Sequence, residues 1–240
     1  MDNQASAHGG VSRRSVLASC SLEFLAARER EWARIAVPAV LIFTTLTLIV
    51  TLVHIDRFHL GPSFAFETRF LTWVWIAVYA IVPIVMSALL VPQLRAHGAA
   101  DHRRAPLPGW VRLTLIVHAL IMALLGLGLL LFPQAVAPLW PWMLTPLTAR
   151  AIGAWLLSLG VAAAHASGEN NWSRVRPAVG SYVILAALQF IALARYPADV
   201  NWASLSAWVY IIFLLSVLAL GVSGTIAARQ ANHRLAPAAG

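Results

Sequence analysis

Six long apolar stretches, nearly free of charged residues, constrain the fold of this chain more than any other feature of its sequence. They run over about residues 35–55, 68–91, 110–132, 146–166, 177–193 and 202–228. Each is close to the ~20 residues that an α-helix needs to cross about 30 Å of hydrocarbon. Lipid offers the backbone no hydrogen-bond partner, so the stretches must be helical. The sequence therefore predicts an all-α integral membrane protein with six transmembrane helices.

The composition agrees with this class. The 240 residues are 60% hydrophobic and 11% charged, whereas a soluble domain is nearer half apolar and a quarter charged. All 17 basic residues are arginine, which suggests a GC-rich coding genome and hence a bacterium. The single cysteine, Cys20, excludes an internal disulfide and a cysteine-based metal cluster.

The arginines predict the orientation. With the N-terminus inside, 13 arginines fall on the cytoplasmic side and 4 on the outer side, which follows the positive-inside rule. The prediction is three in–out–in hairpins with both termini cytoplasmic. The cytoplasmic set is Arg13, Arg14, Arg28, Arg30, Arg34, Arg95, Arg103, Arg104, Arg112, Arg174, Arg176, Arg229 and Arg234. Because helix-end arginines explain the positive charge, we expect no nucleic acid partner.

Three regions are expected along the chain: an N-terminal cytoplasmic tail at 1–33, the transmembrane domain at 34–229 and a C-terminal tail at 230–240. The tail contains Arg13-Arg14 and a lipoprotein-like sequence before Cys20. Neither is followed by the apolar stretch of ~7–15 residues that an export signal needs. We therefore interpret this region as a tail with a short amphipathic helix over about 16–25.

Helix ends and helix contacts are also predicted. Thr145-Pro146 and Arg176-Pro177 are expected to begin the fourth and fifth helices, and Asp199 or Asn201 to cap the sixth. Small residues let helices approach closely in lipid, which favours one compact bundle and leaves self-association open. The small residues are Gly126, Gly128, Gly160, Ala164, Gly221, Gly224 and Ala228.

A candidate metal site lies at the outer end of the first helix. It consists of His54, Asp56, His59 and Glu67, whose imidazole and carboxylate groups suit zinc or iron. These residues do not share one helical face, so the chain must turn between them to bind one ion. The simpler interpretation is an interfacial cap, in which Asp56 pairs with an arginine and the histidines meet headgroups.

A candidate cofactor site consists of His118 and His165, which lie in adjacent helices that run antiparallel. Two facing imidazoles would hold a haem iron or line a quinone site. The simpler interpretation is one interhelical hydrogen bond for each, or an interfacial His165. We expect no cofactor as the default.

The four outer arginines, Arg57, Arg69, Arg150 and Arg195, form a candidate site for an anion or a lipid headgroup. Ordinary snorkelling to the interface is the alternative. The proline-rich loop 133–144, with its two tryptophans, would cover such a site, contact the outer leaflet or a partner, or rest on its own bundle.

No apolar stretch contains Asp or Glu, and no motif for phosphate binding or hydrolysis is present. The first hypothesis is therefore a non-enzymatic scaffold, accessory subunit or lipid-binding bundle, with the bilayer and a second copy or another membrane protein as partners. The second is a carrier for a small or amphiphilic molecule, built around a polar cavity at Gln189, Thr47 and Ser87. The third is a haem- or metal-binding redox protein.

Overall fold

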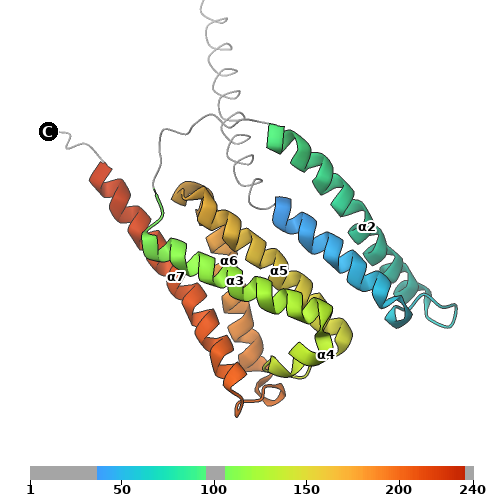
Figure 1. The fold of residues 1–240 in the computed structure, drawn as a ribbon. Coiled ribbons are helices and arrows are strands. Elements are labelled where there is room, and N and C mark those ends of the chain that lie inside the picture. The colour runs from blue at the N-terminus through green and yellow to red at the C-terminus, as the bar shows by residue number, and fades with distance from the viewer. Residues whose placement is uncertain (1–36, 96–105, 236–240) are drawn as a thin grey trace, which may run out of the picture.

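The computed structural model describes residues 37–95 and 106–235, and every regular element in this part is helical (Figure 1). The long helices are Val37–Val53, α2 (Phe66–Arg95), α3 (Gly109–Leu131), α5 (Pro146–Glu169), α6 (Trp172–Arg195) and α7 (Leu205–Leu235). The short ones are η1 (Ile55–Arg57), α4 (Pro133–Val136), η2 (Ala137–Leu139) and η3 (Pro197–Asp199).

Five helices, namely α2, α3, α5, α6 and α7, are long and apolar enough to cross a membrane. The helix Val37–Val53 is also apolar but shorter within the described residues. The predicted class, an α-helical multi-pass membrane protein, fits these helices. The number of six crossings and their orientation remain predictions.

The helix Val37–Val53 lies beside α2, and the pairs α3–α5 and α6–α7 each lie side by side as antiparallel neighbours (Figure 1). The pair α3 and α5 is central, with α6 and α7 on one side. On the other side, Ser158 Oγ in α5 donates a buried hydrogen bond of 2.7 Å to the carbonyl of Ala39. Trp75 Nε1 in α2 donates to Thr51 Oγ1 at 3.2 Å, which joins α2 to the helix Val37–Val53.

The central pair is close because glycines face each other where α3 and α5 meet. A Cβ added to Gly126 would lie 2.7 Å from Leu157 N and 2.8 Å from Gly153 O. A Cβ added to Gly153 would lie 2.7 Å from Gly126 O. Only glycine allows the two backbones to approach this closely.

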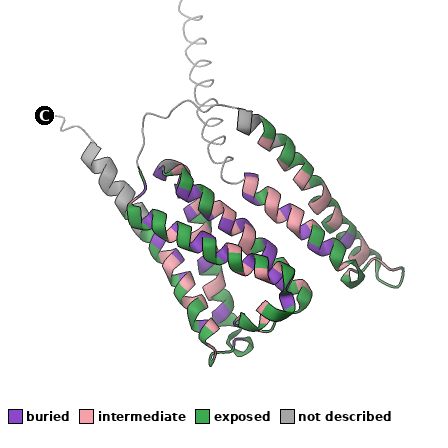
Figure 2. Cartoon of the chain, viewed as in Figure 1, coloured by how far each residue is buried: buried purple, intermediate pink, exposed green. Residues whose placement is uncertain are grey.

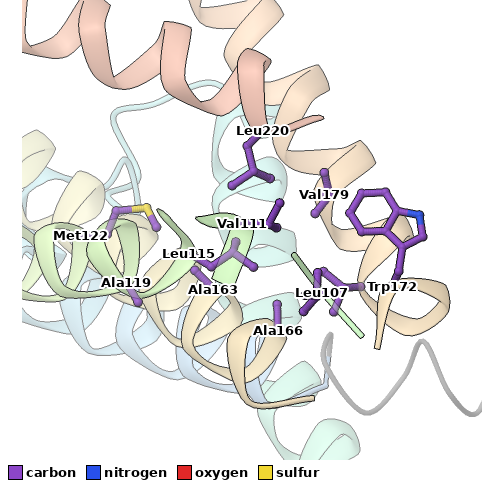
Figure 3. Packing of buried hydrophobic residues seen from close by; sticks show 11 residues of the cluster. Leu107, Val111, Leu115, Ala119, Met122, Ala163, Ala166, Trp172, Val179 and Leu220 are labelled. Atoms are coloured by element: carbon purple, nitrogen blue, oxygen red, sulfur yellow. The ribbon is translucent and has the colours of Figure 1, made fainter. Parts of the chain in front are cut away.

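The core lies between these helices and not around α2. One cluster joins α3, α5, α6 and α7 through Val111, Leu115, Ala163, Val179 and Leu220, all of them buried (Figure 3). A second cluster continues along α6 and α7. Most of the α2 residues whose burial is described are exposed (Figure 2), including large apolar ones such as Phe66 and Ile84. In a bilayer such a surface faces lipid tails at no cost.

The predicted start of the fourth helix is confirmed and the other two starts are wrong. Thr145 Oγ1 accepts a hydrogen bond from the Thr148 backbone N–H at 3.2 Å. Helix α6 begins at Trp172, because the carbonyl of Asn171 already accepts the first helical hydrogen bonds. Pro177 therefore lies inside the helix and not at its start. The sixth long helix begins at Leu205 and is capped by Ser204.

Ser204 replaces the two predicted caps for a local reason. Its Oγ accepts from the Ala207 N–H at 3.3 Å, the geometry of an N-cap. Asp199 belongs to the short helix η3, and the carbonyl of Asn201 accepts from the backbone N–H and the hydroxyl of Ser204. The chain therefore makes a turn before α7 starts.

The small residues differ in what they contact. Gly126 and Gly160 lie at the α3–α5 contact, as expected, and Gly221 faces Val183 of α6. Gly128 instead faces Val136 of α4, because the chain folds back after α3. Ala164 is exposed.

Some expectations lie outside the described residues. These are the arginine pair Arg13-Arg14 and the amphipathic helix over about 16–25, which contains Cys20. Gly224 and Ala228 belong to α7, but their surroundings are not described either.

We expect Gly126→Ala to destabilise the protein by about 1–3 kcal/mol, because the new methyl group meets backbone atoms that cannot move aside. Gly180→Ala in α6 is the matched control, since nothing lies within 4 Å of its added Cβ. The control is expected to be neutral or slightly stabilising. Thermal unfolding in detergent measures both, and equal melting temperatures would contradict the close α3–α5 contact.

Candidate functional site

A cavity of about 180 Å³ lies between α3, α5, α6, α7 and the segment that follows η2. Its wall is largely apolar and aromatic. It is lined by Met122, Trp140, Trp142, Ile152, Trp155, Leu156, Leu159, Tyr182, Leu185, Ala186, Gln189, Tyr210, Phe213, Leu214 and Val217. Cavities of this kind, with few polar groups, are typical of small-molecule sites.

An aromatic cluster lines the cavity near the start of α7. Trp140 and Trp142 contact each other edge to face at 5.4 Å between ring centroids, and they lie 5.7 and 5.5 Å from the ring of Tyr210. The carbonyl of Pro141 accepts a hydrogen bond of 2.9 Å from the backbone N–H of Asn201. The loop 133–144 therefore rests on its own bundle, which is one of the alternatives that the sequence left open.

Gln189 is the main polar group of the wall. The Tyr210 hydroxyl donates to Gln189 Oε1 at 3.0 Å, which fixes the side-chain amide between α6 and α7. Within the described residues the amide nitrogen of Gln189 has no hydrogen-bond partner. Nearby, Trp140 Nε1 is buried and is likewise without a partner among the described residues.

A second polar group, Tyr182, connects the cavity to a buried network at His118. Ser216 Oγ donates its only hydrogen to the carbonyl of Phe213 at 2.6 Å. Nε2 of His118 must therefore donate to Ser216 Oγ, at 2.8 Å. Nδ1 then accepts from the Tyr182 hydroxyl, 3.3 Å away. The network joins α3, α6 and α7 and satisfies both nitrogens of a neutral imidazole.

The two histidines of the candidate cofactor site have different surroundings. His118 is 4% exposed, and its partners come from α6 and α7. His165 lies on α5 and is exposed. His118 therefore matches the simpler interpretation, an interhelical hydrogen bond. An iron ligand at His118 would have to displace Ser216 or Tyr182, and a cofactor held by both histidines stays an untested prediction.

The residues of the candidate metal site do not gather around one point. The described residues contain no group of three or more His, Cys, Asp or Glu side chains that could hold a metal ion. Asp56 pairs with the adjacent Arg57 at 3.2 Å on the surface. His59 packs against the ring of Phe64, and Glu67 is exposed in the first turn of α2.

His54 has a different partner, Arg150. Arg150 Nη1 lies 2.8 Å from His54 Nε2, and Arg150 Nε donates to the carbonyl of Leu130 at 3.2 Å. The arginine thus joins α5 to α3 and to the end of the helix Val37–Val53. These two hydrogen bonds give Arg150 a packing role in addition to any contact with headgroups.

The other outer arginines have separate surroundings. Arg57 and Arg195 are exposed, and Arg195 Nε donates to the neighbouring Tyr196 hydroxyl at 3.2 Å. Arg69 is half-buried, and its Nε has no hydrogen-bond partner among the described residues. An anion or headgroup site shared by the four arginines stays an untested prediction.

Sequence reasoning identified Gln189 and His118 but missed Tyr182, Tyr210 and Ser216. All five are polar residues within apolar stretches. A search for every hydroxyl in these stretches would have found the missing three. It would not have paired them, since each partner comes from another helix.

Comparisons with protein-family models, with curated proteins and with solved structures find no match to this chain. The site must therefore be interpreted from its own chemistry.

We expect His118→Phe to destabilise the protein by about 1 kcal/mol, because it removes two interhelical hydrogen bonds of ordinary strength for a membrane protein. His165→Phe, at an exposed position on α5, is the control and is expected to leave stability unchanged. Unfolding in detergent measures both. Ser216→Ala and His118→Phe remove the same hydrogen bond, so we expect their effects on the free energy of unfolding not to add. If the double variant loses the full sum of the two effects, the His118–Ser216 hydrogen bond is refuted.

Proposed function

We propose that this chain is a non-enzymatic, multi-pass membrane protein that binds a lipid or another amphiphilic molecule between its helices. The observation that supports this most directly is the cavity between α3, α5, α6 and α7. The described part of its wall contains no charged side chain and only a few polar ones, a composition suited to the apolar part of such a molecule.

The cavity has the size of a ligand fragment and not of a whole lipid. An apolar cavity of roughly 150 Å³ is enough to hold benzene, so about 180 Å³ accommodates one ring or a short segment of chain. Trp155 lines the cavity and leaves 44% of its surface exposed. We infer that the ligand enters beside Trp155 and that the rest of it stays in the bilayer.

The proposal includes the topology expected from the sequence: six crossings in three in–out–in hairpins, both termini cytoplasmic, in a bacterial inner membrane. The distribution of arginines, 13 against 4, supports this orientation. A cysteine-accessibility scan of the two termini and of the η1–α2 connection tests it.

The carrier and redox hypotheses have less support. A carrier built on Gln189, Thr47 and Ser87 needs these residues at one cavity, but only Gln189 lines it. Thr47 is buried on the helix Val37–Val53, and Ser87 is exposed on α2. A haem bound by His118 would compete with the hydrogen bonds that already occupy both ring nitrogens.

The scaffold or accessory role is compatible with ligand binding and rests on α2. This helix has a mostly exposed apolar surface, which lipid, a second copy or another membrane protein would cover. Cross-linking in native membranes from cysteines placed along α2 tests for a protein partner.

We expect Ala186→Phe to abolish ligand binding, because a phenyl ring at this lining position fills the cavity. Ala187→Phe is the matched control, since the neighbouring alanine is exposed and faces away. Native mass spectrometry of the purified proteins measures the mass retained on each. A bound amphiphile present on the wild type and the Ala187→Phe variant but lost from the Ala186→Phe variant is expected. Equal occupancy in all three would refute the cavity as the site.

A further inference from the structure

We propose that the part of the ligand inside the cavity is uncharged and carries a carbonyl oxygen that accepts a hydrogen bond from Gln189. This inference rests on the proposed function and specifies the class of molecule that the site binds. It depends on which polar groups line the cavity and on which of their hydrogen-bonding positions are already used.

The amide of Gln189 is fixed as a donor. Its Oε1 accepts the hydroxyl hydrogen of Tyr210 at 3.0 Å, so the oxygen faces α7. The amide group carries two N–H donors on its other side, and the described residues supply them with no acceptor. An N–H donor in an apolar cavity contributes most to the free energy of binding when the ligand provides a hydrogen-bond acceptor.

The other hydroxyls near the cavity are already used. Tyr182 is bound to His118 Nδ1 at 3.3 Å and lies 3.4 Å from Met122 Sδ, and Tyr210 is bound to Gln189. Among the hydroxyl and amide groups of the described wall, Gln189 is therefore the one left to bind a ligand oxygen. Trp140 Nε1, buried without a partner among the described residues, is a second donor beside the same cavity.

The lining also selects against charge. No charged side chain is found among the described residues of the wall, so a carboxylate or phosphate entering it would lose its hydration without gaining a counter-ion. A carbonyl oxygen costs far less to bury and is satisfied by one N–H donor. The chemistry therefore favours an ester or ketone oxygen close to an apolar chain or ring.

Two kinds of membrane molecule offer this group: the ester carbonyl of a diacyl lipid and the ring carbonyl of an isoprenoid quinone. Both place a neutral oxygen next to apolar carbon, and both leave a long apolar part outside a cavity of about 180 Å³. The shared chemistry is the proposal, and the experiment distinguishes the two sources.

The test compares heptadecan-2-one with heptadecane, two radiolabelled probes that differ only in the carbonyl. Each is titrated into detergent-purified protein, and the amount retained after gel filtration is measured. We expect the wild type to bind the ketone roughly five- to tenfold more tightly than the alkane, the value of one net hydrogen bond. Gln189→Leu is expected to remove this preference and to leave alkane binding unchanged.

The position of the hydrogen bond is tested by infrared spectroscopy of the bound ketone labelled with ¹³C at its carbonyl. Donation by Gln189 shifts the carbonyl stretch to lower frequency, and Gln189→Leu is expected to reverse the shift. Gln189→Met, which keeps the length of the side chain, is the second variant in case the first does not fold. Tyr210→Phe keeps the donor but frees the amide, so we expect a smaller, partial loss of the preference.

The outcomes separate the two proposals. Equal binding of ketone and alkane, both blocked by Ala186→Phe, would overturn the carbonyl inference and leave the lipid-binding function intact. Failure of both probes to bind would overturn the proposed function itself. A ketone preference that persists without Gln189, or stronger binding of palmitate at pH 8 than of the ketone, would refute the site described here.

Competition against the bound ketone distinguishes the two kinds of membrane molecule that could supply the carbonyl group. Dioctanoylglycerol represents the ester lipids, and decylubiquinone represents the quinones. Displacement by either one supports the inference and names the class, whereas displacement by neither contradicts it.

Discussion

The close contact between α3 and α5 is the constraint on which the rest of the structure depends. Gly126 and Gly153 allow the two backbones to meet at a distance that no side chain permits, and Gly160 extends the contact toward the other end. In lipid there is little hydrophobic driving force between helices, so packing at such contacts must hold a bundle together. The other helices are arranged around this pair, with α6 and α7 on one side and the helix Val37–Val53 on the other.

The cavity follows from the same arrangement. Large side chains, including Trp155, Leu159 and Phe213, line the space between the central pair and the α6–α7 pair without filling it. The loop after η2 then folds over this space because Trp140 and Trp142 pack on Tyr210. Stability and binding thus come from different parts of α5: its glycines contact α3, while its larger side chains face the cavity.

Polar residues within the apolar helices serve two purposes. His118, Tyr182 and Ser216 satisfy one another across three helices and fix how these helices are rotated. Gln189 is held on one side by Tyr210 and keeps donors on the other. A fully satisfied network is what packing alone requires. Gln189 instead lines an apolar cavity and has amide hydrogens that no described residue accepts, which suits recognition of a neutral ligand.

The sequence alone determined the class of the protein, since long apolar stretches admit no other regular structure than helix in lipid. It also determined the start of α5 at Thr145-Pro146 and the importance of Gly126 and Gly160, because these depend on local chemistry and on residue size. It could not show that Arg150 contacts His54, or that His118 contacts Ser216 and not His165. The partners in each pair are about 100 positions apart, and their contact depends on how the helices are rotated. The cavity at Gln189 could not be predicted from the sequence either. An unfilled volume depends on how side chains from several helices meet, and only the tertiary structure decides this.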